Sequence, residues 1–210
     1  MPIPPDSVLS PLVTLFVVVD PIGLAPTFLA VTHGLPWVAQ RSVAIRASAI
    51  AAGILVGAAL VGHWLLTTLG ISLPAFRIAG GLLLFSIASE MVFGVRTERQ
   101  TRTAEQALEE HVRNIAVFPL AFPLLAGPGA ITATVLLAGQ ADGRPLMLAA
   151  LIAVVIGVCG SCVCIFLLAT RIGNFLGHTG NAVLQRLLGV LLAAMAVQFV
   201  IDGVRAVLAA

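Results

Sequence analysis

The sequence predicts an all-α, polytopic membrane protein of six transmembrane helices, built as two inverted three-helix repeats with broken first helices. Composition is the first observation behind this prediction. Of the 210 residues, 60% are apolar and 10% are charged, and the mean hydropathy is +1.10. A soluble domain is about 45–50% apolar and about 25% charged. Six spans of about 20 residues would use nearly the whole chain, which leaves no room for a soluble catalytic or nucleic-acid-binding domain.

The six expected spans follow from uninterrupted apolar stretches, which are the second observation. Each stretch is bounded by turn residues or by charges. Six spans form a single transmembrane domain, with repeat one at 7–93, a linker at 94–114 and repeat two at 115–208. The expected helices cover Ser7–Thr32, Ala47–Leu69, Leu73–Phe93, Ile115–Ala138, Leu146–Ala169 and Ala182–Leu208.

Arginine placement predicts how the chain is oriented. All 11 basic residues are arginines, set against 9 acids and without a polybasic run, so nucleic acid is not expected as a partner. Basic residues accumulate in cytoplasmic loops, and the first, third and fifth connections carry eight arginines against three on the other face. Both termini are therefore expected outside the cytoplasm, and the 94–114 linker is expected to be a solvated cytoplasmic loop. The eight are Arg41, Arg46, Arg96, Arg99, Arg102, Arg113, Arg171 and Arg186; the three are Arg77, Arg144 and Arg205.

A weak internal repeat is the third observation. Pro/Gly interruptions fall within the first and fourth spans, around Pro21 and Pro128, 107 residues apart. Arg-x-x-Gly-x-Leu-Leu begins the third and sixth spans, at Arg77 and Arg186, 109 residues apart. Because three spans are an odd number, the second copy would enter the membrane in the opposite sense. Inverted repeats of this kind form many secondary transporters.

Both interruptions expose backbone groups. Proline has no amide hydrogen and clashes with the carbonyl four residues earlier, so the carbonyls of Val17, Ile22 and Leu124 should lose their helical partners. A half-helix that starts at Gly23 or Gly129 offers free amides and the positive end of a dipole to a carboxylate. Matched breaks point to a binding site near the midplane, although prolines also kink helices for packing alone.

Asp20 lies 13 residues after Ser7, or about 20 Å along a helix, which places a carboxylate deep in the bilayer. Such residues usually mark substrate or proton pathways. Asp20 could therefore face a substrate amine, act as a protonatable coupling site, or cap the half-helix that follows. Thr27 and Thr132, one turn into the half-helices, could offer hydroxyls to a ligand or bond back to their own helices.

Other residues carry weaker signals. Arg77 and Arg186 could gate by pairing with Glu90 or Asp202, or could simply snorkel. The Gly53-x-x-x-Gly57 pattern predicts a close-packing face, either within the subunit or in a homodimer. The three cysteines, at 159, 162 and 164, fit small buried hydrophobes better than a soft-metal site. No catalytic motif is present, so we expect neither an enzyme nor a metal centre.

Three segments together resemble the MarC family of bacterial inner-membrane proteins: Asp20-Pro21-Ile22-Gly23 with Pro26, Gly127-Pro128-Gly129-Ala130-Ile131-Thr132, and Arg77-x-x-Gly80-Gly81. That family is related to small neutral amino acid transporters of the SnatA type. The resemblance implies a multi-pass protein of the bacterial cytoplasmic membrane. It implies a site at Asp20, Pro21, Gly23, Gly127, Pro128 and Gly129.

The function expected from the residues and the resemblance is secondary transport of small neutral amino acids, glycine- or alanine-like, or of similar small metabolites, by alternating access around the two breaks. The alternative is a non-transporting membrane scaffold that contacts lipids or other membrane components. Expected partners are a small zwitterionic or polar solute, the lipid bilayer and a second copy of the chain. No cofactor is expected, and coupling to H⁺ or Na⁺ is open. The expected substrate-binding residues are Asp20, Pro21, Gly23, Pro26, Thr27, Gly127, Pro128, Gly129 and Thr132.

Overall fold

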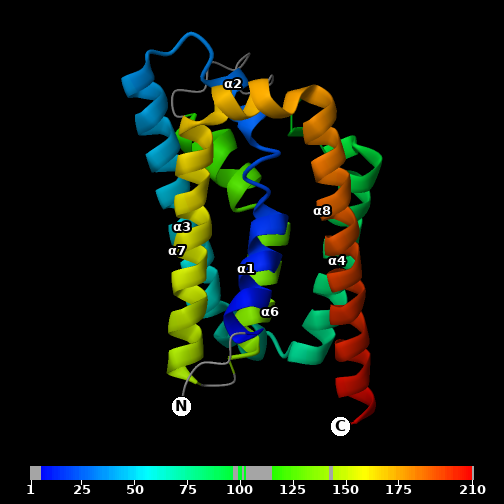
Figure 1. The fold of residues 1–210 in the computed structure, drawn as a ribbon. Coiled ribbons are helices and arrows are strands. Elements are labelled where there is room, and N and C mark those ends of the chain that lie inside the picture. Colours follow the sequence, from blue (N-terminus) through cyan, green and yellow to red (C-terminus); the bar gives the residue numbers. More distant parts are fainter. Residues whose placement is uncertain (1–5, 97–98, 101, 103–114, 142–143, 210) are drawn as a thin grey trace.

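The computed structural model of the chain describes residues 6–96, 99–100, 102, 115–141 and 144–209. Within these ranges the protein is all-helical, which confirms the predicted class (Figure 1). Eight helices follow one another in the described residues. They are α1 (Asp6–Val19), α2 (Ala25–Val31), α3 (Trp37–Thr68), α4 (Leu73–Phe93), the π-helix η1 (Ala116–Leu125), α6 (Pro128–Gly139), α7 (Pro145–Leu167) and α8 (Ala169–Leu208).

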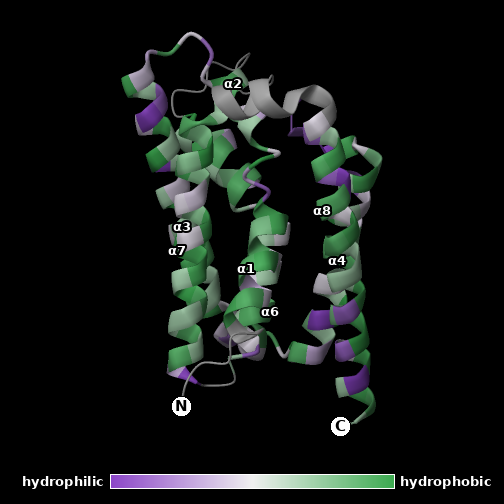
Figure 2. Ribbon diagram, in the orientation of Figure 1, coloured by the Kyte–Doolittle hydropathy of each residue, from purple (hydrophilic) through white to green (hydrophobic). Residues whose placement is uncertain are grey.

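Four of these helices are long and apolar enough to cross a bilayer: α3, α4, α7 and the Gly180–Leu208 part of α8. The bent pair η1 and α6, which meet at 57°, makes a fifth candidate if it counts as one span. α1 is apolar but shorter. Figure 2 shows apolar residues along the greater part of these helices. Length and composition thus support four or five spans, and the six-span inverted repeat stays a prediction.

Two helix boundaries differ from those predicted. α3 begins at Trp37 rather than Ala47, after Pro36 in an extended conformation. α8 begins at Ala169, so the connection expected from Arg171 to Asn181 is helical. Hydropathy underestimates the length of both helices, because charged and polar residues end an apolar stretch without ending the helix that contains it. Proline and left-handed glycine do end helices here: α4 covers the predicted Leu73–Phe93 and stops at Gly94, whose φ is +80°.

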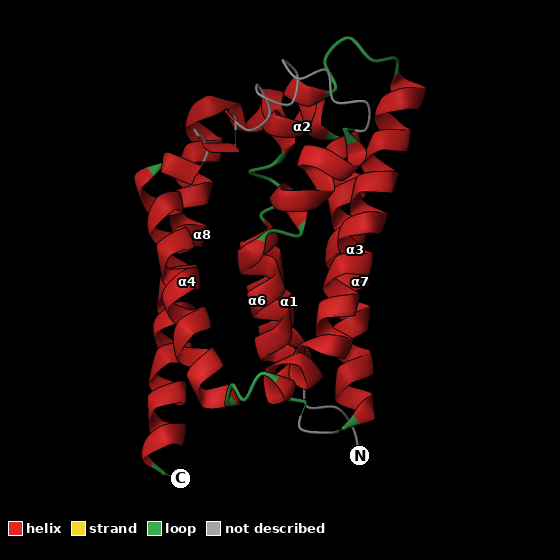
Figure 3. Ribbon diagram, turned by 180° about the vertical axis from the view of Figure 1, so that it is seen from behind, coloured by secondary structure: helices red, strands yellow, loops and turns green. Residues whose placement is uncertain are grey.

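The helices form a central pair flanked by two outer pairs. Figures 1 and 3 show α1 and α6 in the middle, with α3 and α7 on one side and α4 and α8 on the other. α1 runs towards the upper end of Figure 1 and α6 runs away from it, so the two broken elements have opposite directions. α1 packs against α7 and α8, whereas α6 packs against α3 and α4. Each broken helix therefore contacts the outer helices of the other half.

Two glycines bring α4 and α8 into close contact. A Cβ on Gly81 would lie 2.7 Å from the Ala196 carbonyl oxygen, and a Cβ on Gly189 would lie 3.1 Å from the Ala88 carbonyl oxygen. Each half thus contributes a glycine that lets the other half's helix approach its backbone. Of the two glycines in the repeated Arg-x-x-Gly motif, Gly189 packs in this pair, whereas Gly80 faces Thr132 and Leu136 of α6.

This contact predicts that Gly81→Ala destabilises the protein. The new methyl group would press on the Ala196 backbone carbonyl, which cannot rotate away as a side chain can. Overpacking of this kind costs about 1–3 kcal/mol, more than the gain of up to about 1 kcal/mol from replacing glycine in a helix. Thermal unfolding in detergent should therefore show a lower midpoint than for the unmodified chain.

Gly53 on α3 supplies the matched control. Apart from neighbouring residues of α3 itself, no described atom lies within 4 Å of a Cβ placed on Gly53 or on Gly57. The packing face predicted for these glycines is therefore not used by described parts of the subunit, and the homodimer remains a prediction. Gly53→Ala should leave the midpoint unchanged or raise it. Equal midpoints for the two variants would contradict the packing role of Gly81.

Candidate functional site

The first break separates α1 from α2 at residues 20–24. Asp20 has a φ of +56°, a left-handed conformation that non-glycine residues seldom adopt. Its N–H still donates to the Phe16 carbonyl at 2.9 Å, and its own carbonyl accepts from the Leu24 N–H at 3.0 Å. Pro21 has no N–H to donate. The chain thus leaves the helix at Asp20 and enters α2 after one irregular turn.

The Asp20 side chain holds this turn together. Its Oδ1 accepts from the Gly23 N–H at 3.0 Å, and its Oδ2 lies 3.4 Å from Nε2 of Gln185 on α8. The side chain is buried, with 1% of the residue exposed. A Cβ on Gly23 would collide with both Asp20 and Gln185, so only glycine fits there. Asp20 thus occupies the Gly23 amide in the turn before α2, while α2 itself has Leu24 at its N-cap and no side-chain cap.

The second break separates η1 from α6 and has a different character. Phe118 and Phe122 have extended backbone conformations within η1, and Gly127 is extended before α6 begins at Pro128. No side chain caps α6 within the described chain. The first amides of a helix have no partner within it, and no hydrogen bond to the N–H groups of Gly129 or Ala130 is found among the described residues. Within the described residues, this helix N-terminus is therefore open.

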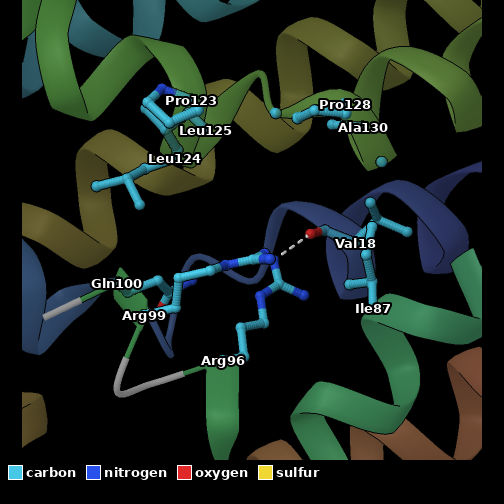
Figure 4. A pocket seen from close by; sticks show the side chains of 12 residues that line it. Val18, Ile87, Arg96, Arg99, Gln100, Pro123, Leu124, Leu125, Pro128 and Ala130 are labelled. Carbon is cyan, nitrogen blue, oxygen red and sulfur yellow. Dashed lines mark hydrogen bonds between the residues drawn. The ribbon is translucent and has the colours of Figure 1, made fainter. Parts of the chain in front are cut away.

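A cavity of about 280 Å³ lies at this open N-terminus (Figure 4). It brings together the end of α1, the second break, one residue of α4 and the segment that follows α4. A Cβ on Gly129 would lie 3.5 Å from Cγ1 of Val18, so the last turn of α1 lies against the second break. The cavity is lined by Val18, Ile87, Arg96, Arg99, Gln100, Pro123, Leu124, Leu125, Gly127, Pro128, Gly129 and Ala130.

Arg96 is the central charged group of the cavity and is only 6% exposed. Its Nη2 donates to the Val18 carbonyl at 2.7 Å, and its Nη1 lies 3.1 Å from the Met91 sulfur (Figure 4). Val18 is within the last turn of α1, where carbonyls lose their helical partners. Arg96 thus satisfies a backbone acceptor that the first break exposes, and ties the segment after α4 to that break.

Further charges surround Arg96. It interacts electrostatically with Asp20, Glu90 and Arg99, and Arg99 forms an ion pair with Glu90 at 2.9 Å. Gln100 also lines the cavity, is 5% exposed, and its Oε1 has no hydrogen-bond partner among the described residues. The prediction of a solvated linker is therefore wrong for Arg96 and Gln100, which are buried. Residues 97–98, 101 and 103–114 of that linker lie outside the described residues.

The structure separates the predicted site residues into two groups. Gly127, Pro128 and Gly129 line the cavity. The others are not among its lining residues: Asp20, Pro21, Gly23, Pro26 and Thr27 belong to the first break or to α2, and Thr132 faces Gly80 of α4. Sequence reasoning missed Arg96, Arg99 and Gln100. Their position directly after a span was a signal for a membrane-surface anchor, not for a buried site.

The suggested gates are not formed as pairs in this structure. Glu90 pairs with Arg99, and Asp202 accepts from Gln198 at 2.8 Å. Arg186 is exposed, and the Nε of Arg77 is buried without a hydrogen-bond partner in the described part of the chain. Cys159 and Cys162 are buried in the core and Cys164 is exposed.

Comparison with known proteins places this architecture in a family. Residues 6–208 match the description "MarC family integral membrane protein". The chain is 35% identical over 195 residues to a UPF0056 membrane protein of Methanocaldococcus jannaschii, covering 93% of this chain and 94% of that protein. It is 37% identical over 193 residues to a UPF0056 membrane protein of Pyrococcus abyssi, covering 92% of each. No solved structure matches. The chain therefore belongs to the MarC family of integral membrane proteins.

Proposed function

We propose that the chain is a secondary transporter of small neutral amino acids, glycine- or alanine-like, and that the cavity at the N-terminus of α6 binds the substrate carboxylate. The observation that carries the proposal is that the last turn of α1 and the second helix break meet at one cavity, which holds a buried arginine and the N-terminus of α6. Broken helix at membrane depth is tolerated where it is buried in protein or lines a cavity.

The carboxylate would bind through three donors. The N–H groups of Gly129 and Ala130 point out of the first turn of α6, where the helix dipole favours negative charge. Arg96 supplies a guanidinium, which binds carboxylates through charge-assisted hydrogen bonds. Gly129 matters because the absence of a side chain lets a ligand reach the backbone.

Charge balance supports a neutral substrate. Arg96 and Arg99 carry two positive charges, and Asp20 and Glu90, which act on the same guanidinium, carry two negative charges. A zwitterion would enter this balanced region without adding net charge. The cavity, at about 280 Å³, is close to the lower limit of about 300 Å³ for ordinary small-molecule sites, which favours a small solute.

Transport would follow from relative movement of the two broken helices. α1 and α6 run in opposite directions and each packs against outer helices of the other half, as expected for inverted repeats that move around a shared site. The Arg96–Val18 hydrogen bond joins the segment after α4 to the first break. Opening of the cavity would require this bond to release. We place the protein in the bacterial cytoplasmic membrane, with both termini outside the cytoplasm.

Counterflow in liposomes tests the function. Purified protein should exchange labelled glycine or alanine across the vesicle membrane. Gly129→Leu should reduce that flux at least tenfold, because the new side chain would enter the cavity beside Ile87 and Val18, and displacing a ligand by a few ångströms removes its charge-assisted bonds, each worth about 1.5–3 kcal/mol.

Gly160→Leu on α7 is the matched control, because Gly160 is exposed and no described atom lies within 4 Å of its Cβ position. This variant should keep full flux. Undiminished flux in Gly129→Leu would rule out this cavity as the site. Absence of flux with every small amino acid, in protein that remains folded, would favour the scaffold function instead.

A further inference from the structure

The cavity holds a polar group that carboxylate binding does not use. Gly129, Ala130, Arg96 and Arg99 offer hydrogen-bond donors to the cavity. Gln100 also offers an acceptor, its Oε1, which is buried and unpartnered within the described chain. Leaving a buried acceptor unpaired is unfavourable, and about 90% or more of such groups find a partner. The orphan oxygen therefore points to a ligand that donates a hydrogen bond.

The position of Gln100 separates this acceptor from the carboxylate donors. In the view of Figure 4, Gln100 lies at one side of the cavity and Pro128 and Ala130 lie at the other, with the Arg96 guanidinium between them. A ligand between them would meet the α6 amides on one side and the Gln100 side chain, next to Arg99, on the other. The Ile87 side chain, next to Gly129, limits how bulky such a ligand can be.

We propose that Gln100 is a specificity-determining residue whose Oε1 accepts a hydrogen bond from the ammonium group of the substrate. The inference rests on the proposed transport function and assigns to Gln100 the discrimination between amino acids and simple carboxylates. Simple monocarboxylates of the same size, such as propionate, would satisfy the donors but leave the Gln100 oxygen unpaired. A site that hydrogen-bonds a substrate group discriminates against analogues that lack it.

Competition experiments on the reconstituted protein test this role. The affinity for alanine and for propionate is measured by how well each competes with labelled alanine. The unmodified protein should bind alanine at least tenfold more tightly than propionate. Gln100→Leu should weaken alanine about tenfold or more, the range for a hydrogen bond to a charged group, and leave propionate unchanged, so the preference disappears.

Two further variants make the test specific. Gln100→Glu keeps an acceptor and adds a negative charge, so alanine binding should persist and propionate binding should weaken. Gln198→Leu removes a glutamine that is exposed on α8 and bonds within its own helix to Asp202, so it should leave both affinities unchanged. Thermal unfolding of each variant verifies that it is folded.

The outcomes separate this inference from the transport proposal. If alanine is transported but Gln100→Leu weakens both ligands equally, or neither, then Gln100 does not recognise the ammonium group and its oxygen is satisfied by water. The same conclusion follows if Gln100→Leu fails to fold and Gln100→Glu binds propionate as well as the unmodified protein does. If the unmodified protein neither binds nor transports any small amino acid, both proposals fail together.

Discussion

Arg96→Gln should weaken alanine binding and lower counterflow at subsaturating alanine about 10- to 150-fold. The substitution removes the buried guanidinium from the cavity and leaves a shorter, uncharged polar side chain. A hydrogen bond to a charged partner contributes about 1.5–3 kcal/mol, and each 1.4 kcal/mol is a factor of ten in affinity. Concentration dependence of counterflow in liposomes measures the effect.

The loss of alanine counterflow should be specific to a buried arginine and to the geometry of its guanidinium group. Arg41→Gln removes an exposed arginine from α3 and should leave flux unchanged. Arg96→Lys keeps the charge but loses the planar fork that can bond the Val18 carbonyl and a carboxylate together, so it should recover only part of the activity. Full alanine counterflow in a folded Arg96→Gln variant would contradict the proposed carboxylate site.

The sequence could predict the breaks because proline and glycine act locally. Pro21 and Pro128 interrupt helical hydrogen bonding whatever surrounds them, and the structure has an irregular turn at the first and a new helix start at the second. The close packing of α4 against α8 likewise follows from glycines on the two helices, Gly81 and Gly189. Helix breaks and close helix contacts can be predicted because they depend on the chemistry of the proline and glycine residues at those positions.

The partners at each break could not be predicted in this way. Asp20 and Gln185 are separated by 165 residues, and Arg96 and Val18 by 78. Nothing in the local sequence shows that Asp20 turns towards α8 to cap its own turn, or that an arginine just beyond a span folds back into the cavity. Both depend on how the broken helices pack between the outer pairs.

Asp20→Ala should lower the free energy of unfolding by about 1–3 kcal/mol, the range for leaving a buried hydrogen-bond donor without its partner. The substitution leaves the Gly23 N–H and the Gln185 amide without the carboxylate they bond. It also removes a negative charge that acts on buried Arg96. Denaturant or thermal unfolding in detergent measures the change, and Asp202→Ala, on the α8 surface, should change it by about 0.5 kcal/mol or less.

A double-mutant cycle separates the electrostatic part of this effect from the capping part. If Asp20 stabilises the fold partly by balancing Arg96, then Asp20→Ala combined with Arg96→Gln should cost less than the two single substitutions added together, by about 0.5–3 kcal/mol. Transport should stay low in the double variant, because the carboxylate site still lacks its guanidinium. Strict additivity would mean that Asp20 acts only as a cap for the first break. In that case the charge balance of the cavity would rest on Glu90 alone, and the preference for a neutral substrate over an anion would lose its main electrostatic support.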